Sequence, residues 1–149
     1  MSQLKRVQTM KILGVTVTNG LSFSLHVQAV ITSCAQTLYA LRVLRAHGLC
    51  GSALKTIFRA VVVAKLLYAS SAWWGFASAA DRQKIKAFIG QCTRAGFCAS
   101  DLGDCEALYT SADRQLFDKV LYRSDHLLYQ FLPPIIFQNY SLEDRVHHR

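Results

Sequence analysis

The charged residues in the first half of the chain are all cations. The 149 residues include 17 Lys and Arg and 9 Asp and Glu, and no acid precedes Asp81. The cations before this position are Lys5, Arg6, Lys11, Arg42, Arg45, Lys55, Arg59 and Lys65. Basic and acidic residues are equal in number from residue 81 onward, so the net charge of +8 belongs to the first 80 residues. Cations without neighbouring acids attract phosphates, which predicts contact with nucleic acid; solvated surface charge is the alternative interpretation.

The acids of the chain form no recognisable catalytic pattern. A two-metal site for phosphoryl transfer needs paired carboxylates, and the first 80 residues contain none. Of the later acids, Asp81, Asp113, Asp118 and Asp125 stand singly on the predicted helices. Phosphate-binding glycine loops, His-Glu-x-x-His and nucleophile-elbow motifs do not occur in the sequence. We therefore expect no enzymatic activity, no cofactor and no metal site.

The five cysteines are predicted to be free thiols. Cys34 and Cys92 fall in helical patterns and are expected to be small core residues. The spacing of Cys92, Cys98 and Cys105 fits no common set of zinc ligands. Free thiols are typical of a reducing compartment, so we expect an intracellular protein.

No segment of the sequence is expected to enter a membrane. The residues after Arg6 lack the apolar stretch of a signal peptide. The most apolar window, residues 60–80, is interrupted by Lys65, and the remainder is too short to span a bilayer. This window is therefore predicted to be a buried helix, with no membrane as partner.

The N-terminal segment is predicted to form a β-hairpin. Residues 10–17, Met-Lys-Ile-Leu-Gly-Val-Thr-Val, alternate in part and are rich in β-branched types, which is typical of a strand. An Asn-Gly pair within residues 18–20 is a strong turn signal. A short return strand is expected at 21–23, and Ser22 or Ser24 is expected to cap the first helix.

Apolar residues that recur every three or four positions predict four helices. The predicted helices span residues 25–46, 53–70, 81–94 and 112–131. Gly48 is expected to end the first helix in a left-handed conformation, and Ser52 and Ser111 to cap the second and fourth. The predicted fold class is mainly α, an N-terminal β-hairpin followed by three to four packed helices. The expected domain organisation is a loose N-terminus, a single hairpin-plus-helical domain and a flexible tail, at residues 1–9, 10–134 and 135–149.

Two pairs of residues are placed by their spacing. Trp73 and Trp74 are adjacent, so they cannot both face the core from one helix. At least one is expected in the core, and the other would cover a neighbouring side chain or stack on a ligand. Lys55 and Arg59 lie four positions apart and point the same way from the predicted second helix. Their mutual repulsion is tolerable on a surface that meets an anion.

Six segments of the chain carry a recognisable pattern in a fixed order. They are KILGVTVTNGLSFSLHV (11–27), LYALRVLRAHGL (38–49), VAKLLYASSAWWGFASAADRQKIKAFI (63–89), CTRAGF (92–97), LFDKVL (116–121) and HLLYQFLPP (126–134). Together they resemble the C-terminal part of reverse transcriptases from non-LTR (LINE-type) retrotransposons, over nearly the whole chain from residue 10. Thr18, Phe23 and Ser71 depart from the Asp, Trp and Pro that are common in that family.

The resemblance implies a primer grip followed by a thumb, the parts that hold a primer–template duplex. The segment carrying Lys11, Ile12, Leu13 and Gly14 resembles the primer grip, where a glycine lets the backbone approach the sugar-phosphate chain. Phosphate contacts are expected from Lys11, Arg42, Arg45, Lys55 and Arg59. The family's palm, with its paired aspartates, is not in this sequence. The resemblance therefore implies a truncated fragment without polymerase activity that binds an RNA–DNA duplex or RNA weakly.

Two other interpretations stay open. The segment 11–46 is also similar to the N-terminal part of an AlkB-type RNA-modifying dioxygenase and methyltransferase, but the iron ligands and the glycine loop of those enzymes are lacking. In the second interpretation the chain is a helical protein-interaction module, whose tryptophan pair and apolar stripes meet a partner. An isolated thumb would expose apolar surface, so self-association is expected in either case.

Overall fold

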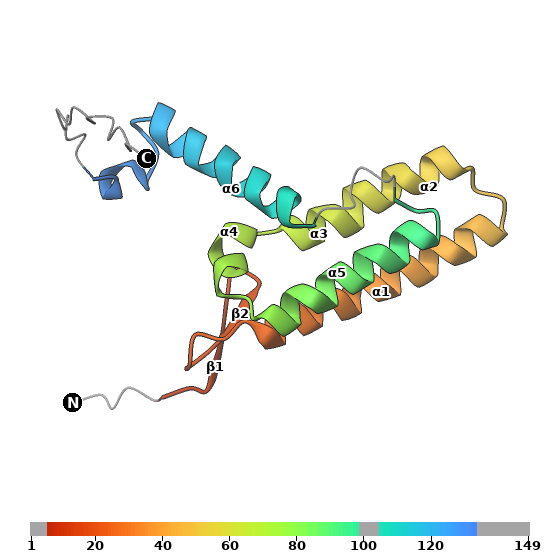
Figure 1. The fold of residues 1–149 in the computed structure, drawn as a ribbon, viewed down its shortest axis with the longest axis horizontal. Helices are drawn as coiled ribbons and strands as arrows, with labels where there is room; N and C mark the ends of the chain where they lie inside the picture. Colours follow the sequence, from red (N-terminus) through yellow and green to blue (C-terminus); the bar gives the residue numbers. More distant parts are fainter. Residues whose placement is uncertain (1–5, 99–104, 134–149) are drawn as a thin grey trace, which may run out of the picture. The chain divides into compact units, whose positions relative to one another are not determined.

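The computed structural model describes residues 6–98 and 105–133. Its fold is mainly helical, with an N-terminal two-stranded antiparallel hairpin followed by four helices of three turns or more, which confirms the predicted fold class (Figure 1). The elements are β1 (Thr9–Ile12), β2 (Val15–Thr18), α1 (Ser24–Ala46), α2 (Gly51–Ile57), η1 (Phe58–Val63), α3 (Ala64–Leu67), α4 (Ser70–Trp73), η2 (Trp74–Phe76), α5 (Ala79–Arg94), α6 (Cys105–Tyr122) and η4 (Tyr129–Phe131). Here η1 is π-helical, and α2, η1 and α3 form one continuous helical run.

The chain divides into two compact units, residues 1–117 and 118–149, with the boundary inside α6. The hairpin and helices α1 to α5 belong to the first unit. Among the described residues, no helix has both the length and the apolar character needed to cross a membrane. The predicted tail at 135–149 and the first five residues of the predicted loose N-terminus lie outside the described residues. The single domain predicted over 10–134 stays a prediction.

The hairpin turns at a different place from the one predicted. The segment 10–17 is not one strand, because β1 and β2 pair with each other and Leu13-Gly14 connects them. The turn predicted at 18–20 exists but leads into α1, and the return strand predicted at 21–23 is absent. Four cross-strand pairs rich in β-branched residues stabilise the observed hairpin more than a three-residue return strand would.

Helix α1 runs from the hairpin to the loop before α2, close to the predicted span of 25–46 (Figure 1). Its C-terminal end follows the prediction. Gly48 adopts a φ of +90°, and the backbone NH of Leu49 donates to the carbonyl of Leu44 at 3.0 Å. This arrangement satisfies carbonyls of the last turn that have no partner within the helix.

The serine caps predicted for the first two helices are wrong. Phe23 occupies the N-cap position of α1, and its side chain makes no capping hydrogen bond, so neither Ser22 nor Ser24 is the cap. Helix α2 begins two residues earlier than predicted, with Cys50 rather than Ser52 at the N-cap position. Serine is a frequent cap, but the chain enters both helices one or two residues away from the expected position.

The helical run of α2, η1 and α3 replaces the predicted helix 53–70. Its buried residues recur at every fourth position: Leu54, Phe58, Val62 and Leu66. A regular α-helix would rotate a strict four-residue repeat away from the core, and the wider π-helical turns of η1 reduce that rotation. Lys65 fixes this run to α1, because its Nζ donates to Ser33 Oγ at 2.8 Å.

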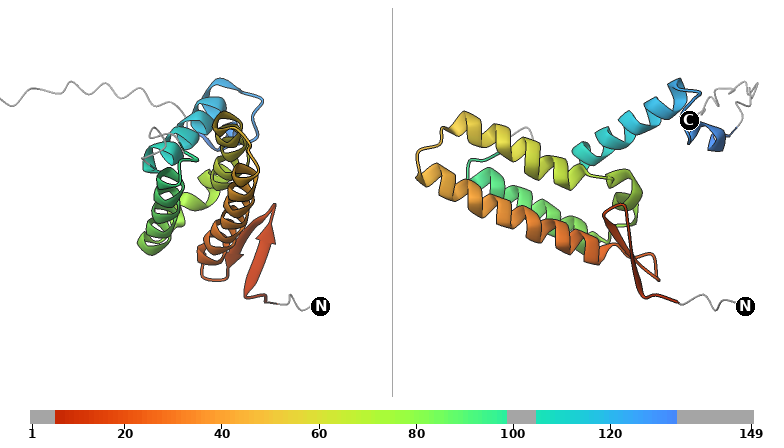
Figure 2. Two further views of the ribbon diagram at one scale, coloured as in Figure 1. Left: turned by 90° about the vertical axis from the view of Figure 1, so that its right-hand side faces the viewer. Right: turned by 180° about the vertical axis from the view of Figure 1, so that it is seen from behind.

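Three helical rods, α1, the α2–α3 run and α5, lie side by side and are called the helical bundle below (Figure 2). They enclose one apolar core. At the N-terminal ends of α1 and α5, Ser24 Oγ donates to Asp81 Oδ2 at 2.6 Å. At their C-terminal ends, Arg45 Nη1 donates to the carbonyl of Ala95 at 2.7 Å. The two helices therefore run in the same direction and are tied at both ends.

Both tryptophans are buried, because the chain changes its helix type between them. Helix α4 ends at Trp73 and the 3-10 turn η2 begins at Trp74. Trp73 is 0% exposed and meets the rings of His26 and Tyr109 edge-on. Trp74 stacks on Tyr109 with 3.8 Å between ring centroids. The expectation of at least one core tryptophan is confirmed, and Trp74 covers a neighbouring ring.

Helix α5 confirms the predicted helix 81–94, but α6 differs from the prediction of 112–131. Helix α6 begins at Cys105 and ends at Tyr122, so Ser111 lies inside it rather than at its cap. The start of α6 is fixed by Tyr109, whose buried hydroxyl donates to the Leu66 carbonyl at 3.3 Å. A single buried tyrosine gives no periodic signal, which explains why the sequence pattern placed the helix too late.

Candidate nucleic-acid interface

The predicted primer-grip residues lie on the hairpin. Lys11 is exposed on β1, opposite Thr16 of β2. Leu13 and Gly14 form the two-residue turn, with φ values of 46° and 87°. Two-residue hairpin turns with positive φ at both positions match the twist of the strands. The left-handed conformation costs a leucine about 1–2 kcal/mol, and the Leu13 side chain is 85% exposed, so packing does not offset that strain.

The other predicted contacts lie on the helical bundle. Arg42 and Arg45 are near the C-terminal end of α1, Lys55 is on α2 and Arg59 is on η1, and each residue is exposed. Arg45 also has a structural role, because its guanidinium bonds to Ala95 and lies 4.5 Å from the centroid of the Phe97 ring. Of the four, Arg45 alone has a hydrogen bond or ring contact identified in the described residues.

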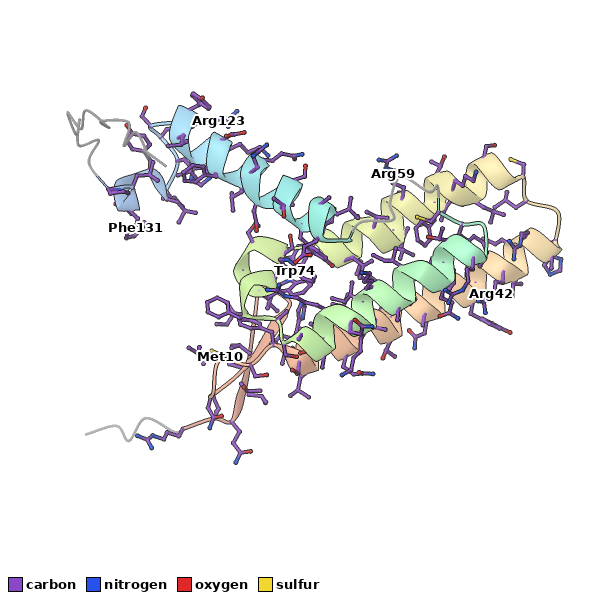
Figure 3. All side chains as sticks on the ribbon, viewed as in Figure 1. Met10, Arg42, Arg59, Trp74, Arg123 and Phe131 are labelled. Carbon is purple, nitrogen blue, oxygen red and sulfur yellow. The ribbon has the colours of Figure 1, made fainter. Side chains whose placement is uncertain are left out.

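The structure does not bring the seven predicted residues into one patch. The hairpin adjoins the N-terminal end of α1, whereas Arg42 is near the C-terminal end, and Met10 and Arg42 mark these ends in Figure 3. Arg59 projects from the helical run at a separate edge of the bundle (Figure 3). The 23 residues of α1 span about 35 Å. The candidate cations therefore fall into two groups: Lys11 on the hairpin, called the hairpin region, and Arg42, Lys55 and Arg59 on separate edges of the helical bundle, called the helical region.

No carboxylate opposes these cations on the hairpin, α1 or the α2–α3 run, because the sequence has none before Asp81. Asp81 itself is 2% exposed. Burial alone would raise its pKa, but hydrogen bonds from Ser24, Ser78 and Lys84, with the charge of Lys84, hold the pKa below its usual range. Asp81 is therefore an ionised internal group and not a surface acid.

The cysteines and histidines of the described residues form no group that could hold a metal ion. Cys34 and Cys92 are buried, as predicted, and burial raises the pKa of their thiols to about 11 and about 12. Cys50 is exposed, and a hydrogen bond with Ser52, whose Oγ lies 3.3 Å from its Sγ, lowers its pKa. All three are free thiols, as expected from the sequence.

His26 makes the stability of the bundle depend on pH. It is buried against Trp73, and burial, followed by the positive charge of Lys11, lowers its pKa below 6.5. The unfolded chain therefore binds a proton first as the pH falls below about 6.5, and the folded chain loses stability in that range. We expect a lower free energy of unfolding at about pH 5.5 than at about pH 7.5. Urea unfolding of the natural chain and of His26→Gln measures this difference.

In His26→Gln, most of the difference in the free energy of unfolding between about pH 5.5 and about pH 7.5 should disappear. In His47→Gln, at an exposed histidine, the difference should remain. Equal pH dependence in both variants would mean that another group titrates.

Sequence reasoning missed Tyr68 as a site residue. Its side chain is 55% exposed, and its hydroxyl donates to the carbonyl of Leu13 at 3.0 Å. The two residues are 55 positions apart, so no local pattern pairs them. The only signal in the sequence is a tyrosine at the end of an apolar helical run, and this is also a common position for a core residue.

Comparison of the chain with models of protein families, with curated proteins and with solved structures finds no match.

Proposed function

We propose that this chain binds the sugar-phosphate backbone of a nucleic-acid duplex, as a thumb-like fragment related to non-LTR reverse transcriptases. The observation that carries the proposal is the exposure of Lys11, Arg42, Lys55 and Arg59 on elements without a single carboxylate. Each lysine or arginine that meets a phosphate releases counterions, which favours binding without base recognition. The family resemblance of residues 11–27 adds the expectation that the duplex is a primer–template.

The distance between the two cationic regions supports a duplex as the ligand. Helix α1, about 35 Å long, separates the hairpin region from the end that carries Arg42. A nucleic-acid duplex carries phosphates along its whole length and can extend over that distance. A ligand that contacts both Lys11 and Arg42 must extend along most of α1, which a duplex can do and a mono- or dinucleotide cannot.

Reversing two charges in the helical region tests the proposal. We expect Lys55→Glu with Arg59→Glu to weaken binding of an RNA–DNA duplex at least about tenfold at low salt. The slope of log affinity against log salt should also fall by about 2, because two phosphate contacts are lost. Fluorescence anisotropy of a labelled duplex over a series of salt concentrations gives both quantities.

The chain offers a matched control on α6 and just after it. Lys119→Glu with Arg123→Glu has the same residue types, spacing and change of charge at exposed positions. This variant should lose affinity only through the change in net charge, and so by much less. Absence of binding by the natural chain at low salt, or an equal loss in both double variants, would refute the proposal.

A second candidate function, a protein-interaction module, is favoured by exposed apolar side chains on β1. Met10 and Ile12 are about half exposed on the same face of the hairpin, and Leu21 and Leu25 are exposed nearby in the sequence. Apolar groups gathered on an exposed edge strand promote association. Salt-independent self-association without duplex binding, measured by analytical ultracentrifugation, would favour this function over the first.

A further inference from the structure

We infer that Tyr68 is a positioning residue, which holds the Leu13-Gly14 turn in the conformation that meets the nucleic-acid backbone. This inference rests on the proposed function. The turn contains strain that its own side chains do not offset, since Leu13 has a φ of 46° and a side chain exposed to solvent. A bulky residue in that conformation persists only where the surroundings enforce it, and such positions gather at functional sites.

The restraint on the turn comes from the end of α3. Tyr68 Oη donates to the Leu13 carbonyl at 3.0 Å. The Tyr68 ring also lies beside Gly14, because its Cε1 would be 3.5 Å from a Cβ built at that glycine. One side chain therefore contacts both residues of the turn.

Tyr68 is itself fixed by the buried part of the molecule. Its backbone carbonyl accepts a hydrogen bond from Trp73 Nε1 at 3.1 Å, and Trp73 is fully buried. The next residue, Ala69, has a φ of 50°, which breaks the helical run after α3, and the Tyr68 side chain remains exposed. The core thus supports an exposed tyrosine whose hydroxyl hydrogen-bonds to the hairpin turn.

This geometry lets Tyr68 restrain the hairpin turn before the nucleic acid binds. A glycine at a turn lets a backbone approach a phosphate closely, but a freely moving turn would lose conformational entropy on each contact. Because the Tyr68 hydroxyl already restrains the turn in the free chain, this entropy is not lost on binding. The restraint also fixes the position of Lys11, two residues before Leu13, relative to the turn. Tyr68 then acts through the turn and does not need to touch the ligand.

A double-mutant cycle in the full chain tests the positioning role. We expect Tyr68→Phe to weaken binding of an RNA–DNA duplex about three- to tenfold, as for the loss of one hydrogen bond. Its effect should be smaller when Lys11→Ala is already present, because both act at the hairpin region. It should be fully additive with Lys55→Ala, which acts at the other region. Tyr39→Phe, at an exposed tyrosine of α1, is the matched control and should leave affinity unchanged.

Hydrogen exchange separates a failure of this inference from a failure of the proposed function. The backbone amides of Leu13 and Gly14 should exchange faster in Tyr68→Phe than in the natural chain. Faster exchange with unchanged duplex affinity, or full additivity with Lys11→Ala, overturns the positioning role but leaves the proposed function standing. If the natural chain binds no duplex, the proposed function fails, and faster exchange then assigns Tyr68 a purely structural role.

Discussion

Replacing Asp81 by alanine is expected to lower the free energy of unfolding by about 2–4 kcal/mol, because hydrogen bonds to a charged group contribute about 1.5–3 kcal/mol each. The buried carboxylate accepts from Ser24 Oγ at 2.6 Å and from Ser78 Oγ at 2.7 Å. The first bond joins α1 to α5, and the second belongs to the N-cap of α5. Removing the carboxylate leaves both hydroxyls without this acceptor and loosens two helix ends together. Urea unfolding followed by circular dichroism measures the loss.

Two further variants make the Asp81 prediction specific. Asp113→Ala, at an exposed acid of α6, should change stability by no more than about 0.5 kcal/mol. Asp81→Asn retains one oxygen acceptor and should fall between the natural chain and the alanine variant. The contribution of Asp81 should also disappear as the pH falls below about 4, since its pKa is held below the usual range. Equal losses in Asp81→Ala and Asp113→Ala would contradict the role given to this carboxylate.

The largest loss of stability is expected for Trp73→Ala, at about 3–5 kcal/mol. Trp73 contacts the rings of His26, Trp74 and Tyr109 at centroid distances of 5.4, 6.1 and 5.8 Å. It therefore links α1, the α4–η2 joint and α6 within the first unit. Alanine would leave a cavity among these rings, and the Tyr68 carbonyl would lose the Nε1 donor. Thermal and urea unfolding would both report this loss.

The exposed aromatic Tyr39 provides the matched control for Trp73. Its side chain is largely exposed, so Tyr39→Ala should shift stability by about 0.5 kcal/mol or less. Trp73→Phe should keep part of the ring packing while removing the Nε1 hydrogen bond, and should therefore lose less stability than the alanine variant. If Trp73→Ala unfolds at the same urea concentration as Tyr39→Ala, Trp73 is not a central core residue.

The long periodic helices could be predicted from the sequence. For the hairpin, the sequence predicted its presence but not the position of its turn. Helices α1 and α5 have apolar residues at regular intervals, and both were predicted to within a few residues. The hairpin turn was misplaced because Asn-Gly is the better turn sequence, whereas the chain uses Leu13-Gly14. The preference for this turn depends on Tyr68 and on the packing of Val15, and such distant contacts leave no local pattern.

The candidate site could be predicted as a set of residues but not as an arrangement. The absence of acids before Asp81 can be read directly from the sequence and identifies the cations that have no acid near them in the chain. Their division into two regions follows from the length and direction of α1, which only the packed structure provides. The sequence also could not distinguish Arg45, which holds the end of α5, from Arg42, because the contact with Ala95 joins residues 50 positions apart.

The ties at the two ends of α1 and α5 have an electrostatic consequence. Parallel helices bring like ends of their macrodipoles together, with partial positive charge at the N-termini and partial negative charge at the C-termini. The carboxylate of Asp81 lies where the two positive ends meet, and the guanidinium of Arg45 lies where the two negative ends meet. The first acid of the sequence is thus ionised inside the bundle, where hydrogen bonds from Ser24, Ser78 and Lys84 stabilise its charge and the positive helix ends lie beside it. The positive potential over the hairpin and the helical region therefore extends outward without an opposing charge from these elements.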